Sequence, residues 1–420
     1  MSRRNAYAAI AAACVLPRLV VLLYERGDLL TSFTEKSDDF ARTFVESGTY
    51  GFIPGEPSAY TQPLYGFLLV PFYALDGRNW AVVGLVQIAL AVVTALLVYE
   101  IGRRWLSPRV AVGAAVVATL NPYLVWHDVH VNREIVDQVL AAALVLATLA
   151  VASRPTLLRA GGLGALCGLA ILGNSRLILL PFLLLAYLAW RLGAWRLGAW
   201  RRLVVPAAVL VAATGLVLAP WVVRNKVEVG CAAITTDARA LWKANNVETD
   251  QVLESGRWID AVPRFPGDPP TPEDAGVVYR ETGTVIELDE CEQMRVYQDR
   301  VVDFWREHPG EKAELAARGA GMLWDPRVTR NEENPGAGTW IDTLRDLPAG
   351  IAFAVLFAAA LAGLRYAPRW FSVLAVSLLA YQTVFAMLFV GATRYRAPWD
   401  FLLVLLAASA AAPALARLRR

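Results

Sequence analysis

Two adjacent carboxylates follow the first apolar segment of this 420-residue chain, in Ser37-Asp38-Asp39-Phe40-Ala41-Arg42. Either carboxylate could act as a general base that deprotonates an acceptor hydroxyl while a sugar leaves a phosphate. The alternative is a helix N-cap, because Ser37 or Asp38 could cap a helix running toward Gly48 and place acid at its positive end. Both interpretations stay open, and residue types alone favour the cap.

A second group of ionisable residues lies between two apolar segments, in His127-Asp128-Val129-His130-Val131-Asn132-Arg133-Glu134-Ile135-Val136-Asp137. Ionisable groups so near a membrane interior are functional by default. We expect Glu134 to begin a span and to point into a cavity shared with Asp38. His127 and His130 have the spacing of metal ligands, but no third ligand is near, so polar caps at the membrane surface are the favoured interpretation.

Arginines form a third group on the same predicted face as these acids. A phosphate leaving group requires permanently charged donors that can bind it in a bidentate manner, and guanidinium supplies them. The alternative for each arginine is a pair with a nearby acid or contact with lipid phosphates. The members of this group are Arg133, Arg176, Arg224, Arg394 and Arg396.

The elements that must position these residues are apolar segments. Hydrophobic residues make up 56% of the chain and charged residues 18%, so a bilayer is its main solvent and a soluble multidomain protein is excluded. The net charge of +3, with basic residues at segment ends, argues against a nucleic-acid partner. Apolar segments lie near 6–24, 80–101, 109–126, 136–152, 160–174, 177–190, 203–222, 348–364, 370–390 and 398–416.

The positive-inside rule gives the topology. Arginine clusters fall at alternate segment ends when the stretch 62–76 is omitted, so we predict ten spans, both termini in the cytoplasm and an interfacial or re-entrant segment at 62–76. We take the first segment as a retained span. The predicted parts are a transmembrane module at 1–223 with an outer loop at 26–79, an extracytoplasmic insert at 224–346 and C-terminal spans at 347–420.

The insert is predicted to be a small α/β or irregular domain with a helix around 290–318. It contains Cys231 and Cys291. An oxidising outer compartment would allow a disulfide between them, but the sequence leaves open whether they are bonded. No Walker-type loop, dinucleotide fingerprint, zinc motif or serine-nucleophile elbow occurs, so ATP-driven transport and soluble cofactor chemistry lack support.

Seven short motifs occur in order along the chain. The first four are Asp38-Asp39, Thr61-Gln62-Pro63-Leu64-Tyr65, Arg133-Glu134 and Pro220-Trp221-Val222-Val223-Arg224-Asn225. The others are Leu241-Trp242-Lys243-Ala244-Asn245-Asn246, Phe304-Trp305-Arg306-Glu307-His308-Pro309 and Arg394-Tyr395-Arg396-Ala397-Pro398. This order resembles the membrane GT-C glycosyltransferases, specifically the family 39-like group with the protein O-mannosyltransferases and the aminoarabinose transferase of lipid A.

The resemblance implies an all-α polytopic fold and a polyprenyl-phosphate sugar as donor substrate. It implies that Asp38, or Asp39 beside it, activates the acceptor and that Glu134 positions a substrate. Candidate substrate and phosphate contacts are Arg133, Arg176, Arg224, Arg394, Arg396 and Tyr65. We therefore expect a multi-pass glycosyltransferase of the cell membrane, with no tightly bound cofactor or metal, that acts extracytoplasmically on a lipid, glycan or protein acceptor. The rival hypothesis is a non-catalytic transporter or flippase of lipid-linked glycans.

Overall fold

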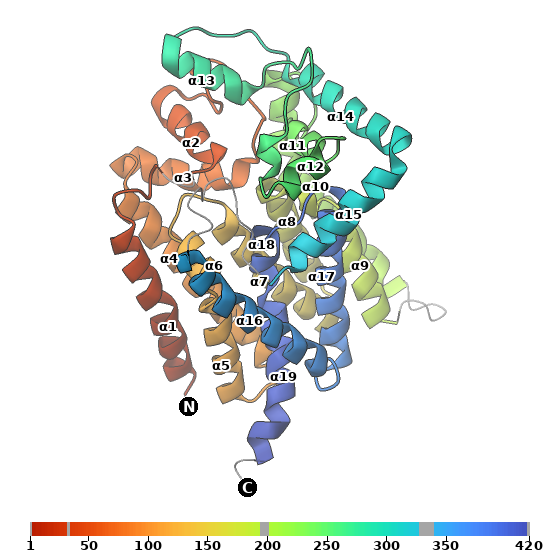
Figure 1. The fold of residues 1–420 in the computed structure, drawn as a ribbon. Coiled ribbons are helices and arrows are strands. Elements are labelled where there is room, and N and C mark those ends of the chain that lie inside the picture. Colours follow the sequence, from red (N-terminus) through yellow and green to blue (C-terminus); the bar gives the residue numbers. More distant parts are fainter. Residues whose placement is uncertain (1, 32–33, 194–200, 327–339, 418–420) are drawn as a thin grey trace.

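The computed structural model describes residues 2–31, 34–193, 201–326 and 340–417, and within these ranges the protein is helical without a β-sheet. A bundle of long helices forms the lower part of the molecule in Figure 1, with both termini at its lower end. Helices of the predicted insert, together with α2 (Lys36–Ser47), lie at the opposite end. The arrangement places the polar segments on one side of the apolar bundle.

All ten predicted apolar segments contain helices. Within the described ranges, five helical segments are long and apolar enough to cross a membrane: α1 (Arg3–Tyr24), α4 (Trp80–Gly102), α7 (Glu134–Ser153), Leu203–Glu228 of α10 (Arg201–Glu228) and α17 (Arg369–Leu388). The others are α5 (Pro108–Thr119), α6 (Pro122–His127), α8 (Leu157–Gly173), α9 (Leu180–Arg191), α16 (Trp340–Gly363) and α19 (Phe401–Arg417). The protein is a multi-pass helical membrane protein, and the number ten for its spans stays a prediction.

The predicted segment 109–126 is divided into α5 and α6. Proline disfavours helical backbone in the residue before it and cannot donate an N–H group. Asn121 accordingly leaves the helical conformation, and its side chain accepts a hydrogen bond from the Tyr123 N–H as an N-cap. The second outer turn therefore begins with a short helix of its own.

The first outer loop contains α2 and α3 (Pro63–Asp76), which pack against each other. Helix α2 ends at Gly48, whose positive φ of 76° is the left-handed conformation that glycine tolerates. The N-cap position of α2 is Glu35 and forms no side-chain cap, so Ser37 or Asp38 as the N-cap was wrong. Helix α3 has 14 residues and lies crosswise near the upper end of α1 in Figure 1.

The insert is built from short helices and irregular loops. They are α11 (Arg239–Lys243), α12 (Thr249–Glu254), α13 (Pro272–Thr282), α14 (Glu290–Glu307) and α15 (Pro309–Trp324). The prediction of one helix over 290–318 was wrong, because Pro309 ends α14 and starts α15. No strand occurs in the described part of the insert, and its stretch 327–339 lies outside the described residues. Helix α10 continues past residue 224, the predicted start of the insert, and α16 begins before residue 346, its predicted end.

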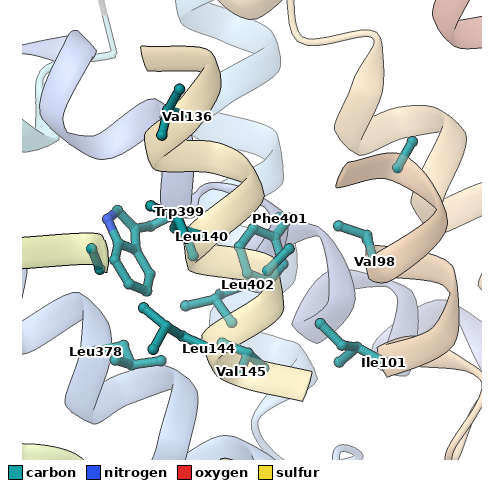
Figure 2. Close-up of a cluster of buried hydrophobic side chains, with 14 of the residues drawn as sticks. Val98, Ile101, Val136, Leu140, Leu144, Val145, Leu378, Trp399, Phe401 and Leu402 are labelled. Carbon is teal, nitrogen blue, oxygen red and sulfur yellow. The ribbon is translucent and has the colours of Figure 1, made fainter. Parts of the chain in front are cut away.

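Apolar side chains from helices far apart in the sequence fill the centre of the bundle. In Figure 2, side chains of α7 and α19 lie between Trp399 of the 3-10 turn η3 (Ala397–Trp399) and Leu378 of α17 on one side and Val98 and Ile101 of α4 on the other. Leu144 is 1% exposed and Leu402 fully buried. In a lipid solvent such contacts stabilise the bundle through close packing, and they fix the helix ends that carry the charged residues.

A buried polar network joins α1, α4, α6 and α7. The Arg18 guanidinium donates to Asp128 Oδ2 at 2.9 and 2.7 Å, and Gln138 donates to the other carboxylate oxygen at 2.5 Å. The side-chain amide of Gln87 donates to the backbone carbonyls of Asp128 and His130 at 3.0 and 2.8 Å. Asp128, one of the ionisable residues of the second outer turn, is thus a structural anchor.

A close backbone contact between α15 and the residues after α17 requires glycine at two positions. A Cβ atom added at Gly391 would overlap the carbonyl oxygen of Gly319. We expect Gly391→Ala to reduce the free energy of unfolding by about 1–3 kcal/mol, the usual cost of overpacking, measured as a lower thermal midpoint in detergent. Gly310→Ala is the control, since a Cβ there meets nothing within 4 Å, and an equal loss in both variants would contradict this explanation.

Candidate active site

A cluster of charges is formed by residues at the ends of three helices. Nη2 of Arg394, in α18 (Thr393–Arg396), lies 2.8 Å from Glu35 Oε1 and 2.8 Å from Glu134 Oε1. Glu35 precedes α2, and Glu134 is the first residue of α7. The Glu134 side chain is 5% exposed and that of Glu35 is 21% exposed. One guanidinium therefore joins two carboxylates from distant parts of the sequence.

Two further arginines lie beside this centre. Arg133 Nε is 3.9 Å from Glu35 Oε1, and its Nη1 donates to Gln62 Oε1 at 2.7 Å. The Arg176 guanidinium lies 3.7 Å from the ring centroid of Tyr395. Burial lowers the pKa of Arg176 most, and the positive charges of Arg133 and Arg394 lower it further. The structure thus gathers three of the five predicted arginines.

Neutral polar side chains surround these arginines. Gln62 also donates to Ser175 Oγ at 3.2 Å, and Asn174 donates to Asp137 Oδ2 at 3.0 Å. These contacts bring the start of α3 and the turn between α8 and α9 to the same place as α7. The resulting charge cluster consists of Glu35, Gln62, Arg133, Glu134, Asp137, Asn174, Arg176, Arg394 and Tyr395.

The pKa of Glu35 is raised above its ordinary value. Burial is the largest cause, and the negative charge of Glu134 adds to it, while Arg133 and Arg394 act in the opposite direction. A carboxylate with a raised pKa binds a proton more readily. Glu35 is therefore chemically suited to proton transfer.

His127 stands next to this cluster as a neutral group. Its ring stacks on Tyr123 with a centroid separation of 3.8 Å, and burial lowers its pKa to about 3. Within the described ranges there is no group of three His, Cys, Asp or Glu side chains placed to hold a metal ion.

Asp38 and Asp39 lie in two different environments. Asp38 is 3% exposed, and its Oδ1 accepts hydrogen bonds from Tyr73 at 2.6 Å and Arg78 at 2.9 Å, while Oδ2 lies 2.5 Å from Arg78 Nη2. These donors fix α2 to the end of α3. In the part of the chain that the structure describes, Asp38 forms no ion pair with an arginine of the charge cluster.

Asp39 faces the insert and is 31% exposed. Its carboxylate lies 3.5 Å from Arg42 and 3.7 Å from Arg280. Burial raises its pKa most, Arg280 lowers it and Asp38 raises it. The partner of Glu134 across Arg394 is therefore Glu35, one helical turn before the two aspartates.

Three other predicted contacts serve the framework. Arg224 donates to the carbonyls of Ser58 and Tyr50 at 2.8 and 3.0 Å and pairs with Glu228 at 2.5 Å. Because these partners occupy Nε and both terminal nitrogens, Arg224 holds the first outer loop against α10.

Arg396 is buried and lies 3.2 Å from Asp400, and it donates to the carbonyl of Leu323 at 2.8 Å. Tyr65, 1% exposed, donates to Gln87 at 2.6 Å and so extends the network around Asp128. Within the described ranges, the side chain of neither residue forms a hydrogen bond or ion pair with the charge cluster.

Sequence reasoning missed five members of the site: Glu35, Gln62, Asp137, Asn174 and Tyr395. Gln62 and Tyr395 lie inside two of the seven motifs, so their position in these motifs indicated that they could belong to the site. Glu35 carried only a weak signal, an acid three residues before the aspartate pair. Only the fold brings Glu35 beside Arg394, which lies 359 residues away in the sequence.

Two of the seven motifs bind each other. Asn245 Oδ1 accepts hydrogen bonds from Trp305 Nε1 at 2.8 Å and Lys312 Nζ at 2.7 Å. Asn245 and Lys312 also donate to carbonyls at the end of α17, at 3.0 Å for Leu388 and 2.8 Å for Met387. These contacts attach the insert to the bundle.

The insert is also fastened to the first outer loop. Cys231 and Cys291 form a disulfide. Next to it, Glu290 Oε2 accepts hydrogen bonds from the Ala59 backbone N–H at 3.1 Å and Thr236 Oγ1 at 2.8 Å. Gln62 of the charge cluster lies three residues after Ala59, so the insert supports this side of the site.

A cavity of about 630 Å³ lies near the site and is lined mainly by apolar side chains. Trp221 of α10 and Phe67 of α3 form part of its wall. Leu64 lines this cavity and lies close to Gly173, which is also close to Asp137 of the charge cluster. Arg224 and Glu228 are at its rim.

Comparison with known proteins identifies the fold. Residues 57–223 match the dolichyl-phosphate-mannose-protein mannosyltransferase family. The oligosaccharyltransferase AglB of the archaeon Archaeoglobus fulgidus, solved with an inhibitory peptide and dolichol-phosphate, superposes with a TM-score of 0.53 at 14% identity. The chain has the GT-C glycosyltransferase fold. That superposition covers 98% of this chain and 51% of AglB, so the chain spans about half the length of its structural neighbour.

A second AglB structure, tethered to an acceptor peptide with an NVT sequon, gives a TM-score of 0.54 at 13% identity over all of this chain and 50% of AglB. ArnT of Cupriavidus metallidurans, bound to undecaprenyl phosphate, gives 0.43 at 16% identity over 94% of this chain and 76% of ArnT, too low a score to support the assignment. No curated protein sequence matches the chain. The GT-C resemblance drawn from the seven motifs is confirmed.

Proposed function

We propose that this GT-C protein is a membrane glycosyltransferase that moves a monosaccharide from a polyprenyl-phosphate donor to a lipid, glycan or protein acceptor. The observation that carries the proposal is the charge cluster, in which Arg133, Arg176 and Arg394 gather beside three carboxylates at the ends of membrane helices. Arginines bind the phosphate that leaves, and a carboxylate takes the proton of the acceptor hydroxyl.

We propose that the transfer takes place in one step. Buried guanidinium groups stabilise charge that develops on a leaving phosphate, and they do so most strongly where water is excluded. A base on the other side of the sugar then allows direct attack with inversion at the anomeric carbon. We propose that no tightly bound metal is needed, because the arginines supply the positive charge.

We further propose that the site faces away from the cytoplasm in the cell membrane. The charge cluster belongs to the helix ends that carry the first outer loop and the insert, whereas the two termini lie at the other end of the bundle (Figure 1). Basic residues near the termini are typical of cytoplasmic ends. A polyprenyl-phosphate donor in the outer leaflet would therefore present its head group to the cluster.

The test is transfer of radiolabelled sugar from polyprenyl-phosphate sugars by the purified protein in lipid nanodiscs. We expect Glu134→Gln to lower the transfer rate at least about 100-fold. The substitution removes one of the two carboxylates that pair with Arg394 and so changes the charge balance of the site. Glu46→Gln, an exposed acid of α2, should change the rate less than twofold. Movement of intact lipid-linked sugar across a liposome membrane without any transfer would instead establish the transporter hypothesis.

A further inference from the structure

We propose that the apolar cavity beside the charge cluster binds the hydrocarbon chain of the acceptor, and that this acceptor is a neutral glycolipid. The inference rests on the proposed function, because it names the acceptor class for that same site. Three features support it separately: the lining of the cavity, the two chain segments that join it to the charge cluster, and the charges at its rim.

The walls of the cavity suit a hydrocarbon chain. Its volume of about 630 Å³ equals that of about 20 water molecules at ~30 Å³ each. Water in such a space requires polar partners, but aromatic and aliphatic side chains form most of the lining. Tyr50 stacks on Phe67 with a centroid separation of 4.5 Å, and Trp221 packs edge-to-face against both rings. This size and lining are typical of a ligand site.

The cavity is continuous with the lipid-facing surface of α10. One face of this helix lines the cavity with Val217, Pro220 and Trp221, whose spacing of three and four residues places them on the same side. The adjoining face carries large apolar side chains that are mostly exposed, namely Leu216, Val223 and Val227. Exposed apolar side chains of a membrane helix contact lipid. A lipid chain can therefore enter the cavity from the bilayer beside α10.

Two chain segments lead from the cavity wall to the charge cluster. Pro63 lines the cavity and directly follows Gln62 of the cluster. Leu172 lines the cavity and lies two residues before Asn174 of the cluster. A lipid whose chain occupies the cavity would therefore hold its head group beside the two side-chain amides of the cluster.

A buried acceptor atom without a partner lies at this end of the cavity. A Cβ atom added at Gly173 would lie 3.2 Å from Leu64 Cδ2 and 3.8 Å from Asp137 Oδ1. Asp137 Oδ1 is buried and has no hydrogen-bond partner among the described residues. Such atoms are costly, and a sugar hydroxyl would donate to this oxygen. A glycolipid supplies both the chain and the hydroxyl.

The rim of the cavity favours a neutral head group. The charged residues of its lining are Arg224 and Glu228, and they pair with each other at 2.5 Å. Arg224 also donates to the carbonyls of Ser58 and Tyr50. A phosphate head group requires charged donors that are available to bind it. The paired rim offers none, so an anionic phospholipid fits less well than a glycolipid.

The donor chain has a separate path to the bilayer. Arg176 lies over the ring of Phe389 at the end of α17, and neither residue lines the cavity. Exposed apolar side chains follow Arg176 closely, at Ile178, Leu179 and Phe182. A polyprenyl chain attached to a phosphate at Arg176 can therefore reach lipid along α9. The donor chain and the acceptor chain then lie against different helices, α9 and α10.

The first experiment labels the cavity of the protein in nanodiscs. The probe is glucosyl diacylglycerol with a diazirine in one acyl chain, and the comparison lipids are phosphatidylglycerol and a polyprenyl phosphate with the same diazirine. Mass spectrometry maps the labelled residues after illumination. We expect the glycolipid to label Phe67 and Trp221 at least about threefold more than either comparison lipid, the size of effect that aromatic contacts contribute.

Two variants test the walls of the cavity. Phe67→Ala removes an aromatic wall, and Pro220→Phe adds bulk at an exposed lining position. Each should lower labelling of Trp221 by the glycolipid about threefold or more. Leu75→Ala is the matched control and should leave labelling unchanged, because Leu75 lies on the same helix as Phe67 but is exposed outside the cavity. Equal thermal midpoints in detergent show that the variants are folded.

The second experiment measures transfer of radiolabelled sugar from its polyprenyl phosphate to two acceptors. These are glucosyl diacylglycerol and its deacylated, water-soluble form. We expect the wild type to use the acylated acceptor with a kcat/KM at least about 10-fold higher, because the chain supplies apolar contacts. Phe67→Ala should raise KM for the acylated acceptor about threefold or more, while kcat and the binding of undecaprenyl phosphate stay unchanged.

The outcomes distinguish the two proposals. Equal labelling by phosphatidylglycerol means that the cavity holds bulk lipid only, and stronger labelling by the polyprenyl phosphate assigns it to the donor; either result overturns the inference. Equal kcat/KM for the two acceptors overturns the acceptor class, while the proposed function stands. If the wild type transfers no sugar but the glycolipid labels the cavity selectively, the proposed function falls and the glycolipid site stands.

Discussion

Arg18→Met is expected to reduce the free energy of unfolding by about 3–5 kcal/mol, because it leaves a buried carboxylate without its cation. Arg18 is 1% exposed and Asp128 is fully buried, and the pair lies inside the helix bundle that α1 and α4 help to form. An unpaired charge at that depth is among the most costly changes in a membrane protein. The measurement is thermal unfolding in detergent, followed by the loss of monodisperse protein.

The double variant Arg18→Met/Asp128→Asn separates this effect from lost packing. It removes both charges together, so we expect it to be more stable than Arg18→Met alone. Arg4→Met at the exposed start of α1 should leave the midpoint unchanged. A double variant no more stable than Arg18→Met would show that the arginine acts through its packing, and the charge explanation would have to be abandoned.

Arg176→Met and Arg133→Met are expected to lower kcat of sugar transfer by about 100- to 1,000-fold each, the usual cost of removing a donor that stabilises charge in the transition state. Arg176 stacks on Tyr395 at 3.7 Å and on Phe389 at 4.7 Å, so its guanidinium is already oriented. Lysine lacks the planar fork and does not stack in the same way. Arg176→Lys should therefore recover little activity.

Initial rates in nanodiscs at saturating acceptor give the comparison, with Arg26→Met as an exposed control. Loss of rate with unchanged binding of undecaprenyl phosphate would indicate a role in the transition state only, whereas a parallel loss of both indicates ground-state binding. Wild-type rates in both variants would remove these arginines from the proposed mechanism.

The bundle itself could be predicted because hydrophobic length is a strong constraint in a bilayer. Each of the ten predicted segments contains a helix. Helix α3, with 14 residues, is one of several shorter apolar helices in the described part of the chain, so its interfacial position stays a prediction. The breaks at Asn121 and His308 were missed although Pro122 and Pro309 follow them. Both prolines lie in stretches whose apolar or helical pattern continues across them, which concealed the breaks.

The charge cluster could be predicted only in part. Arg133, Glu134, Arg176 and Arg394 followed from residue type, because charges at outer helix ends need partners. Arg224 is also an arginine on the same predicted face, but it donates to backbone carbonyls. A pattern of side chains in the sequence does not predict contacts with backbone carbonyls.

Glu35, Asp38 and Asp39 occupy one helical turn, and a sequence alone does not say which of them faces the distant Arg394. That choice depends on the rotation of α2 about its axis. Lys36, which lies 3.1 Å from both Asp237 and Glu273, helps to set this rotation through residues of the insert far along the chain.

The contact between Ala59 and Glu290 joins residues separated by 231 positions, and this has a consequence for biosynthesis. A chain made from its N-terminus exposes the first outer loop long before Glu290 and Cys291 are translated. During that interval the loop can bind neither the carboxylate of Glu290 nor the disulfide-bonded segment beside it. The outer half of the molecule is therefore completed late, after the early spans are already in the membrane. A ribosome-bound chain that ends before residue 290 should leave Ala59 accessible to protease, and one that extends beyond α14 should protect it.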